Sequence, residues 1–484
     1  MPKLQNEIVE RGIDGMAAHI LRKIYAPEFM VRKELQRGEI PSTREAYTTA
    51  LGVAWASILE TFLISLISMA DTIMVSSVGD AAIAAVGLCT QPRFIVMSLV
   101  SSMNVAITSI AARRKGERDP DGAVSCLKQG LILCFGLSLV ISALFYPFAE
   151  RFLWFSGAQD DTIGLATDYF RILLIGIPIN CLSLTISAAQ RGIGNTRASM
   201  NINLCSNIVN LVFNYFLIGG KLGFPALGVS GAAWATVIGW VVGLGVAVAS
   251  VLHRGAYLNV WSREGWRFDK RTLGAMYKVA SGSFLEQICM RVGFFTYAKI
   301  IAGLGTTLFA AHQIVMNIMN LSFCFGEGFG IASSSLVGQN LGAKRPDLSI
   351  VYGKVCQRMS LITSSILFLV LTLFGRQMLT LFTKDDEIIS VGSTIMVIAG
   401  VILFGQASQM IIMGSLRGAG DTKYTAVVSL ICIMILRPGV AYLMAYPLGF
   451  GLIGAWISFL LDQYLRLLLT YIRFSSGRWM KIQL

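Results

Sequence analysis

Long apolar stretches recur along most of this 484-residue chain. A helix needs roughly 20 apolar residues to cross a hydrocarbon layer of about 30 Å. Between residues 50 and 473 we count twelve stretches of that kind, too many for a water-soluble fold. The eighth is long for one span, so we expect part of it to form a loop. The sequence predicts an all-α integral membrane protein. The predicted spans are 50–77, 89–112, 124–147, 167–190, 198–219, 227–252, 275–301, 308–338, 355–376, 391–414, 424–446 and 450–473.

The positive charges of the chain are distributed unevenly. The net charge is +13, which raises the question of a nucleic-acid partner. Most lysines and arginines, however, lie before the first span, after even-numbered spans or behind the last span. This asymmetry follows the positive-inside rule and places both termini in the cytoplasm. We therefore interpret the excess of positive charge as a consequence of membrane topology and expect no nucleic-acid partner.

The chain repeats itself at an offset of 226 residues. Glu60 aligns with Glu286, and the segment 191–196 (Arg-Gly-Ile-Gly-Asn-Thr) aligns with 417–422 (Arg-Gly-Ala-Gly-Asp-Thr). Each half carries six spans, so both halves enter the membrane from the same side. The repeat predicts two six-helix lobes related by a pseudo-two-fold axis along the membrane normal.

The repeat also predicts the domain organisation. We expect a cytoplasmic N-terminal segment and a cytoplasmic tail on either side of two lobes joined by a basic linker. Residues 7–30 read as an amphipathic helix on the membrane surface or, alternatively, as a poorly ordered tail. The predicted boundaries are 1–49 (N-terminal segment), 50–252 (N-lobe), 253–272 (linker), 273–473 (C-lobe) and 474–484 (tail).

Two repeated lobes are typical of secondary transporters, which bind substrate between the lobes and alternate their access. The Gly-rich segment 417–423 lacks the GxxxxGK[ST] spacing of a phosphate-binding loop. We therefore expect no ATP hydrolysis, no cofactor and a monomer that uses an ion gradient or runs downhill. An integral membrane enzyme and a passive channel are the alternatives from other classes, and the chain has no Ser-His-Asp or zinc motif to favour the enzyme.

Polar residues inside the spans are functional candidates because charge in a bilayer is costly. One carboxylate, two amides and one hydroxyl occur in the N-lobe alone: Asp71, Asn210, Asn214 and Thr236. The aligned C-lobe positions hold other side chains, namely Tyr297, Leu436, Val440 and Phe459. A carboxylate with carbonyl oxygens suits a small cation, and a desolvated aspartate can instead take up a proton. The alternative is that these residues form interhelical hydrogen bonds.

Glu60 and Glu286 differ from this group because both lobes carry them. They could face the central cavity and attract organic cations, or they could serve packing or gating, with Arg291 paired to Glu286. Both interpretations remain open at this stage. Lys299 and Arg437 are unusual within spans, and the sequence does not assign partners to them.

Several motifs together resemble the multidrug and toxic compound extrusion (MATE) family. The resemblance extends over nearly all of 50–473. The motifs are 71–75 with Gly79, 190–196, 210–214 with 227–236, 310–314 with Asn317, 338–343 and 416–422. It implies two lobes arranged in a V and export of cationic, amphipathic drugs in exchange for Na⁺ or H⁺. It also implies a cation site at Asp71, Asn210, Asn214 and Thr236, with the backbone carbonyl of Ala232 as a further ligand.

The chain departs from the family pattern at several positions. Asn214 stands where some members carry a second aspartate, and Gln406 stands where sodium-coupled bacterial members carry an aspartate in span ten. Glu286 lies about one turn before the family's span-seven acid, where Met290 falls. These differences favour coupling through the N-lobe. Span one contains no proline, at which some members bend.

The sequence thus predicts a cation-coupled multidrug exporter of a bacterial cytoplasmic membrane. Its expected partners are small organic cations or amphipathic drugs and the lipid bilayer. A flippase for a lipid-linked precursor, or an exporter of an endogenous metabolite, is the alternative within transport. The candidate residues of the substrate cavity are Glu60, Glu286, Arg291 and Gln406.

Overall fold

The computed structural model describes residues 22–156, 158–253, 255–261 and 268–484. Within these residues the chain forms twelve helical segments of membrane-spanning length, which confirms the predicted all-α architecture. The segments are α2 (Thr43–Ser76), α3 (Asp80–Gly116), α4 (Pro120–Phe155), α5 (Ile163–Gly192), α6 (Thr196–Leu217), α7 (Gly228–Leu252), α8 (Lys270–Ala302), α9 (Thr306–Gly342), α10 (Pro346–Thr380), α11 (Asp386–Gly418), the continuous stretch of α12 (Thr422–Ser429), η4 (Leu430–Leu436) and α13 (Arg437–Ala445), and α14 (Gly451–Ser475).

Most of these helices are apolar enough to cross a membrane without help from neighbours. Ten described segments meet that condition by length and hydropathy. The segments α6 and α8 are long enough but more polar, because α6 carries five asparagines and α8 carries several lysines and arginines. Two of the asparagines, Asn210 and Asn214, belong to a polar cluster in the N-lobe.

The structure differs from one expectation about the eighth span, and two other expected segments lie partly outside the described residues. The range 308–338 contains no loop, because α9 runs as one helix from Thr306 to Gly342, so that prediction was wrong. The amphipathic helix expected at 7–30 lies mostly outside the described residues, as does part of the 253–272 linker.

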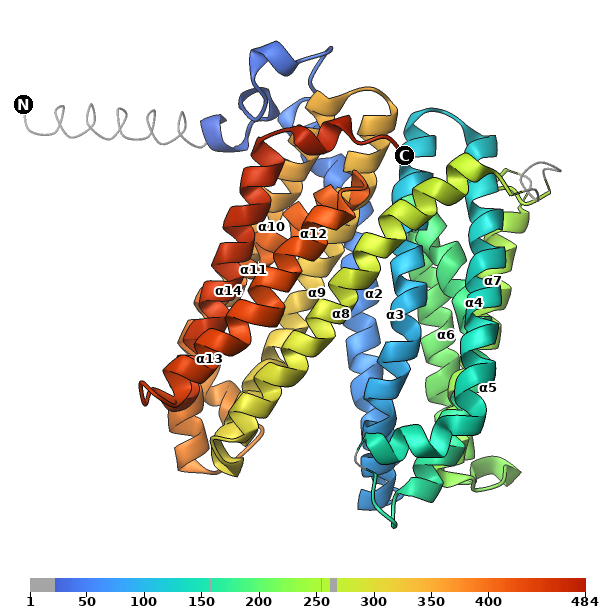
Figure 1. Cartoon of the computed structure of the whole chain (residues 1–484), viewed down its shortest axis with the longest axis vertical. Helices are drawn as coiled ribbons and strands as arrows, with labels where there is room; N and C mark the ends of the chain where they lie inside the picture. The colour runs from blue at the N-terminus through green and yellow to red at the C-terminus, as the bar shows by residue number, and fades with distance from the viewer. Residues whose placement is uncertain (1–21, 157, 254, 262–267) are drawn as a thin grey trace, which may run out of the picture.

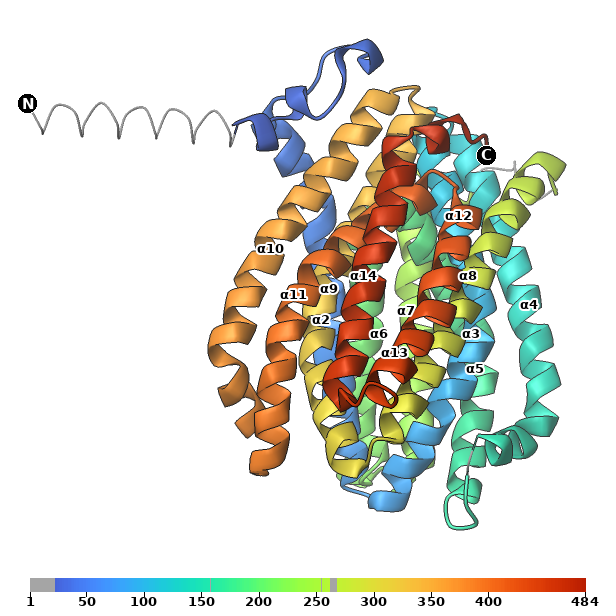
Figure 2. The same ribbon diagram turned by 60° about the vertical axis from the view of Figure 1, so that its left-hand side comes forward.

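The two lobes consist of α2–α7 and α8–α14 (Figure 1). Repeat-related atoms make the same hydrogen bond in each lobe: the Thr196 hydroxyl donates to the carbonyl of Val53 at 2.9 Å, and that of Thr422 donates to Val279 at 2.8 Å. The repeat-related helices α4 and α10 lie at opposite outer edges of the molecule (Figure 2). The sequence repeat therefore reflects a repeated three-dimensional unit.

The lobes meet closely at the end of the molecule where α2 begins and α14 ends (Figure 1). There α3 crosses α9 so tightly that a Cβ atom on Gly116 would overlap the carbonyl of Gln339, and one on Gly342 would overlap the carbonyl of Arg113. Hydroxyl groups add hydrogen bonds across the same contact. The Ser335 hydroxyl donates to the Gly192 carbonyl at 3.0 Å.

The same helix faces are exposed farther from the termini. On α9, Gln313, Asn317 and Asn320 follow the helical spacing that leads to Gly338 and Gly342, yet their side chains are exposed. On α3, Phe94 is likewise exposed, and the long side chain of Arg291 reaches its ring from the C-lobe. The faces that touch at one end thus separate toward the other, and the space between the lobes opens away from the termini.

Segments outside the lobes cover the closed end. Met30 is buried among C-lobe residues, and its carbonyl accepts a hydrogen bond from Lys354 Nζ at 2.7 Å. After α14, the carbonyl of Ile482 accepts from Arg113 of the N-lobe, and that of Gln483 accepts from Lys278 at 3.3 Å. The tail after α14 therefore contacts the opposite lobe.

We expect Gly116→Ala to destabilise the interlobe contact, because its Cβ would meet the backbone of Gln339 rather than a movable side chain. Overpacking of this kind costs about 1–3 kcal/mol. Gly136→Ala on α4 is the matched control, since nothing lies within 4 Å of a Cβ there. Thermal unfolding of the purified protein in detergent should show a lower melting temperature for Gly116→Ala alone. Equal melting temperatures would contradict the tight crossing.

Candidate cation and substrate sites

The structure brings together the polar residues that distinguish the N-lobe. Asn214 Nδ2 on α6 donates to Asp71 Oδ1 on α2 at 2.8 Å. The Asn210 amide, one turn away on α6, satisfies both of its ends when its nitrogen donates to Asp71 Oδ2 at 2.9 Å and its oxygen lies 3.1 Å from Thr236 Oγ1 on α7. The Thr236 hydroxyl also donates to the carbonyl of Ala232 at 2.9 Å. All five predicted residues therefore form one cluster.

The cluster is enclosed, and its charge is solvated by dipoles. Asn210 and Asn214 are buried, and Asp71 is half-buried. Among the described residues Asp71 has no ion-pair partner within 4.0 Å, although Arg93 of α3 interacts with it electrostatically. The buried carbonyl oxygen of Asn214 has no hydrogen-bond partner in the described part of the chain. A carboxylate beside an unpartnered carbonyl oxygen is an arrangement that a small cation can complete.

The corresponding place in the C-lobe is filled differently. Tyr297, at the repeat position of Asp71, donates its hydroxyl to the carbonyl of Ala455 at 2.9 Å. The guanidinium of Arg437 lies 4.3 Å from the ring centroid of Phe459, at the repeat position of Thr236, and 5.7 Å from that of Tyr297. A side-chain cation thus occupies the C-lobe region that matches the N-lobe cluster.

Arg437 has a partner that the sequence did not assign. It forms a buried ion pair with Asp462 of α14, and Arg466 contacts the same carboxylate at 2.9 Å. All three side chains are buried. Lys299, the other unusual cation, is exposed in the last turn of α8.

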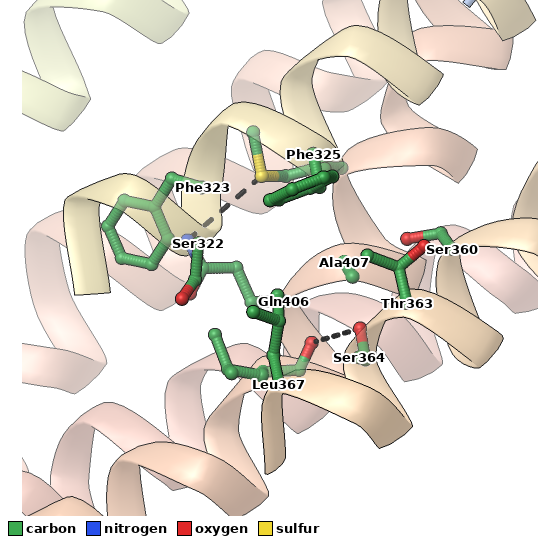
Figure 3. A pocket seen from close by; sticks show the side chains of 12 residues that line it. Ser322, Phe323, Phe325, Ser360, Thr363, Ser364, Leu367, Gln406 and Ala407 are labelled. Carbon is green, nitrogen blue, oxygen red and sulfur yellow. Dashed lines mark hydrogen bonds between the residues drawn. The ribbon is translucent and has the colours of Figure 1, made fainter. Parts of the chain in front are cut away.

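Gln406 lines a small polar cavity inside the C-lobe (Figure 3). The cavity has a volume of about 10 Å³, which is room for roughly one water molecule. The carbonyl oxygen of Gln406 is buried without a partner among the described residues, and the hydroxyls of Ser322, Ser360 and Thr363 lie nearby. The lining contains neutral oxygen atoms and no carboxylate. Removing a cation from water is costly without a carboxylate, so this cavity suits water better than an ion.

Glu60 lies on α2, where its buried carboxylate is held by side chains of α5 and α6. Asn203 Nδ2 of α6 donates to its carboxylate at 2.6 Å, and Arg191 of α5 lies 3.7 Å away. The Ser199 hydroxyl donates to the same carboxylate at 3.3 Å. The side chain does not face open space.

Glu286 repeats this arrangement in the C-lobe. It forms an ion pair with Arg417 of α11 and accepts from the Thr425 hydroxyl at 2.8 Å. Its expected partner Arg291 is elsewhere: the Arg291 guanidinium lies 4.1 Å from the ring centroid of Phe94 on the opposite lobe. The predicted Glu286–Arg291 pair was therefore wrong, because the nearest cation comes from another helix.

Two functional candidates escaped the sequence reasoning. Asp462 lies in the last predicted span and Glu327 in the eighth. Both are charged residues within a span, so both met the criterion used for functional candidates. The repeat offset would have added that Glu327 aligns with Ser101, which makes it a carboxylate of one lobe only.

Comparisons with known proteins agree with this architecture. The MatE family matches residues 56–216 and 283–443. An uncharacterized transporter YisQ of Bacillus subtilis is 28% identical over 429 residues, covering 89% of this chain and 94% of the relative. A probable multidrug resistance protein NorM of Thermotoga maritima is 27% identical over 461 residues, covering 93% and 96%. An outward-facing MATE transporter structure superposes with a TM-score of 0.83 at 23% identity, covering 92% of this chain and 98% of that one.

Two six-helix lobes, with an interlobe space and a polar cluster inside the helices, define a membrane transporter rather than an enzyme. The family match covers most of both lobes. This chain belongs to the MatE family of transporters.

We expect Asp462→Asn to destabilise the C-lobe strongly, because Arg437 and Arg466 would lose their buried counter-ion. Breaking such a pair costs about 3–5 kcal/mol. The exposed Asp386 provides the control variant Asp386→Asn. The measurement is the melting temperature and monodispersity of both variants in detergent. If they behave alike, the buried cluster does not hold the C-lobe together.

Proposed function

We propose that this transporter is a monomeric multidrug exporter that exchanges cationic, amphipathic compounds for Na⁺ or H⁺ without ATP. Relatives from Thermotoga maritima and Pseudomonas aeruginosa are named as multidrug resistance proteins, which supports the substrate class. The bacterial sources of these relatives support a place in a bacterial cytoplasmic membrane. The boundaries proposed for its lobes are 50–252 and 273–473.

The difference between the lobes carries the proposal. In the N-lobe, Asp71 has amide partners and an unpartnered carbonyl oxygen of Asn214 beside it. In the C-lobe, Arg437 supplies a permanent cation that Asp462 neutralises. The N-lobe cluster therefore requires a cation, whereas the matching C-lobe region already contains the cation of Arg437. For this reason the N-lobe binds the coupling ion.

The two asparagines provide a physical switch for this site. Without an ion, their N–H groups donate to the Asp71 carboxylate. Rotation of each amide by half a turn would present oxygen instead, so that Asp71, Asn210 and Asn214 could surround Na⁺. A proton on Asp71 would release the same N–H donors. Either ion neutralises a carboxylate that is expensive to keep charged in a membrane-spanning protein.

The direction of opening fits an exporter in one stage of its cycle. The space between the lobes opens away from the termini, and the positive-inside asymmetry favours cytoplasmic termini. On this orientation the structure corresponds to an outward-open stage. Binding of the ion and release of the drug then occur from the same side, as exchange requires, and each must disfavour the other.

We expect Asp71→Asn to abolish ion-coupled ethidium efflux while the protein stays folded, because the neutral amide no longer requires an ion. The assay uses proteoliposomes with either an imposed Na⁺ gradient or an imposed pH gradient. Asp160→Asn removes an exposed charge from the loop before α5 and serves as the control. The gradient that drives wild-type efflux identifies the coupling ion.

Normal gradient-driven efflux by a well-folded Asp71→Asn protein would refute coupling at this cluster. Absence of efflux by the wild-type protein under both gradients would instead refute drug export.

A further inference from the structure

Glu327 stands at the boundary between the open and the closed part of the lobe interface. It continues the exposed face of α9 that carries Gln313, Asn317 and Asn320, and its own side chain is exposed. Farther along the same face, Gly338 already packs tightly against Ala112 of the N-lobe. Glu327 is the single carboxylate of α9, and it lies before the point at which Gly338 packs against the N-lobe.

The neighbours of Glu327 confirm that this face looks toward the N-lobe. Gly328 packs so closely against Ile58 of α2 that a Cβ atom would overlap that side chain. The carbonyl of Cys324, one turn earlier, accepts a hydrogen bond from the Thr61 hydroxyl of α2 at 3.3 Å. Glu327 thus lies at the floor of the interlobe space rather than on the lipid-facing side of α9.

Two arginines, one from each lobe, lie near Glu327. The Glu327 carboxylate interacts electrostatically with Arg191 of α5 and Arg417 of α11. Both guanidinium groups are partly exposed, with 19% and 32% of their side-chain surface accessible, and each is paired to a buried glutamate, Glu60 or Glu286. In this group of named residues, three carboxylates face two guanidiniums, so one negative charge remains. Because each lobe neutralises its own arginine, the remaining charge resides on Glu327.

We propose that Glu327 is the carboxylate that receives the positive charge of the transported compound, and that the site selects singly over doubly charged cations. The proposal rests on the export function proposed above and names the substrate contact within it. One positive charge neutralises the group, whereas a second charge would stand beside Arg191 and Arg417 without a counter-ion. In a partly desolvated space an unpaired charge weakens binding.

This site is separate from the ion site around Asp71. Glu60 and Asp71 lie on the same helix, eleven residues apart, which corresponds to roughly 16 Å along α2. Glu60 belongs to the group around Glu327, and Asp71 to the cation cluster. Substrate and ion therefore have different primary carboxylates.

The test measures equilibrium binding of ethidium, a monocation, to the purified full-length protein by fluorescence. Glu327→Gln should weaken binding about 10-fold, because it removes the charge and keeps the shape. Glu327→Asp should restore most of the affinity. Glu150→Gln, which removes an exposed carboxylate of α4, should leave it unchanged.

A second probe separates a charge contact from a structural one. Propidium shares the ring system of ethidium and carries a second positive charge, so the wild-type protein should bind it more weakly. Unchanged ethidium affinity in folded Glu327→Gln would overturn the assignment of Glu327. Equal wild-type affinity for the two dyes would overturn the predicted charge selectivity. Failure of the wild-type protein to bind or export ethidium would refute the export function itself, which distinguishes the two proposals.

Discussion

Charge inside a membrane-spanning protein must be compensated, and this constraint organises the structure. Glu60 is compensated by Arg191, Glu286 by Arg417, and Asp462 by two arginines. Asp71 is the exception among these carboxylates, because amide groups rather than a paired cation hold it. Under the proposed function this carboxylate binds an exchangeable ion, whereas a paired carboxylate fixes one helix to another.

The repeat gives the two lobes the same framework of contacts, but a few polar side chains differ between them. The Glu–Arg pairs and the Thr–carbonyl hydrogen bonds occur in both lobes at the same repeat positions, so they belong to the shared fold. Asp71, Arg437 and Glu327 occur in one lobe each, so they are not part of the framework that the two lobes share. The repeat thus accounts for the shared scaffold, and a few positions that differ between the lobes carry the proposed sites.

Local patterns in the sequence predicted the elements and the N-lobe cluster. The apolar runs located the helices, and comparison of the halves singled out Asp71, Asn210 and Asn214, because side chains that one half carries and the other lacks are not required by the shared fold. The partner of Glu286 could not be predicted in the same way. Arg291 was near in sequence, but Arg417 reached the carboxylate from α11, and only the packing of helices decides between them. The exposure of Glu327 depends on where the lobes separate, which no local pattern encodes.

The helix α2 links the two proposed sites through direct contacts. It runs without proline from Thr43 to Ser76 and carries Asp71 toward one end and Ile58 near its middle. Asp71 binds α6 of its own lobe, whereas Ile58 packs against α9 of the other lobe beside Glu327. Sharp helix kinks often occur at proline, and α2 has no proline between these two contacts. Under the proposed function, a shift of α2 caused by an ion at Asp71 would also move the contact next to Glu327, which would give ion and substrate a physical route to disfavour each other without sharing a ligand.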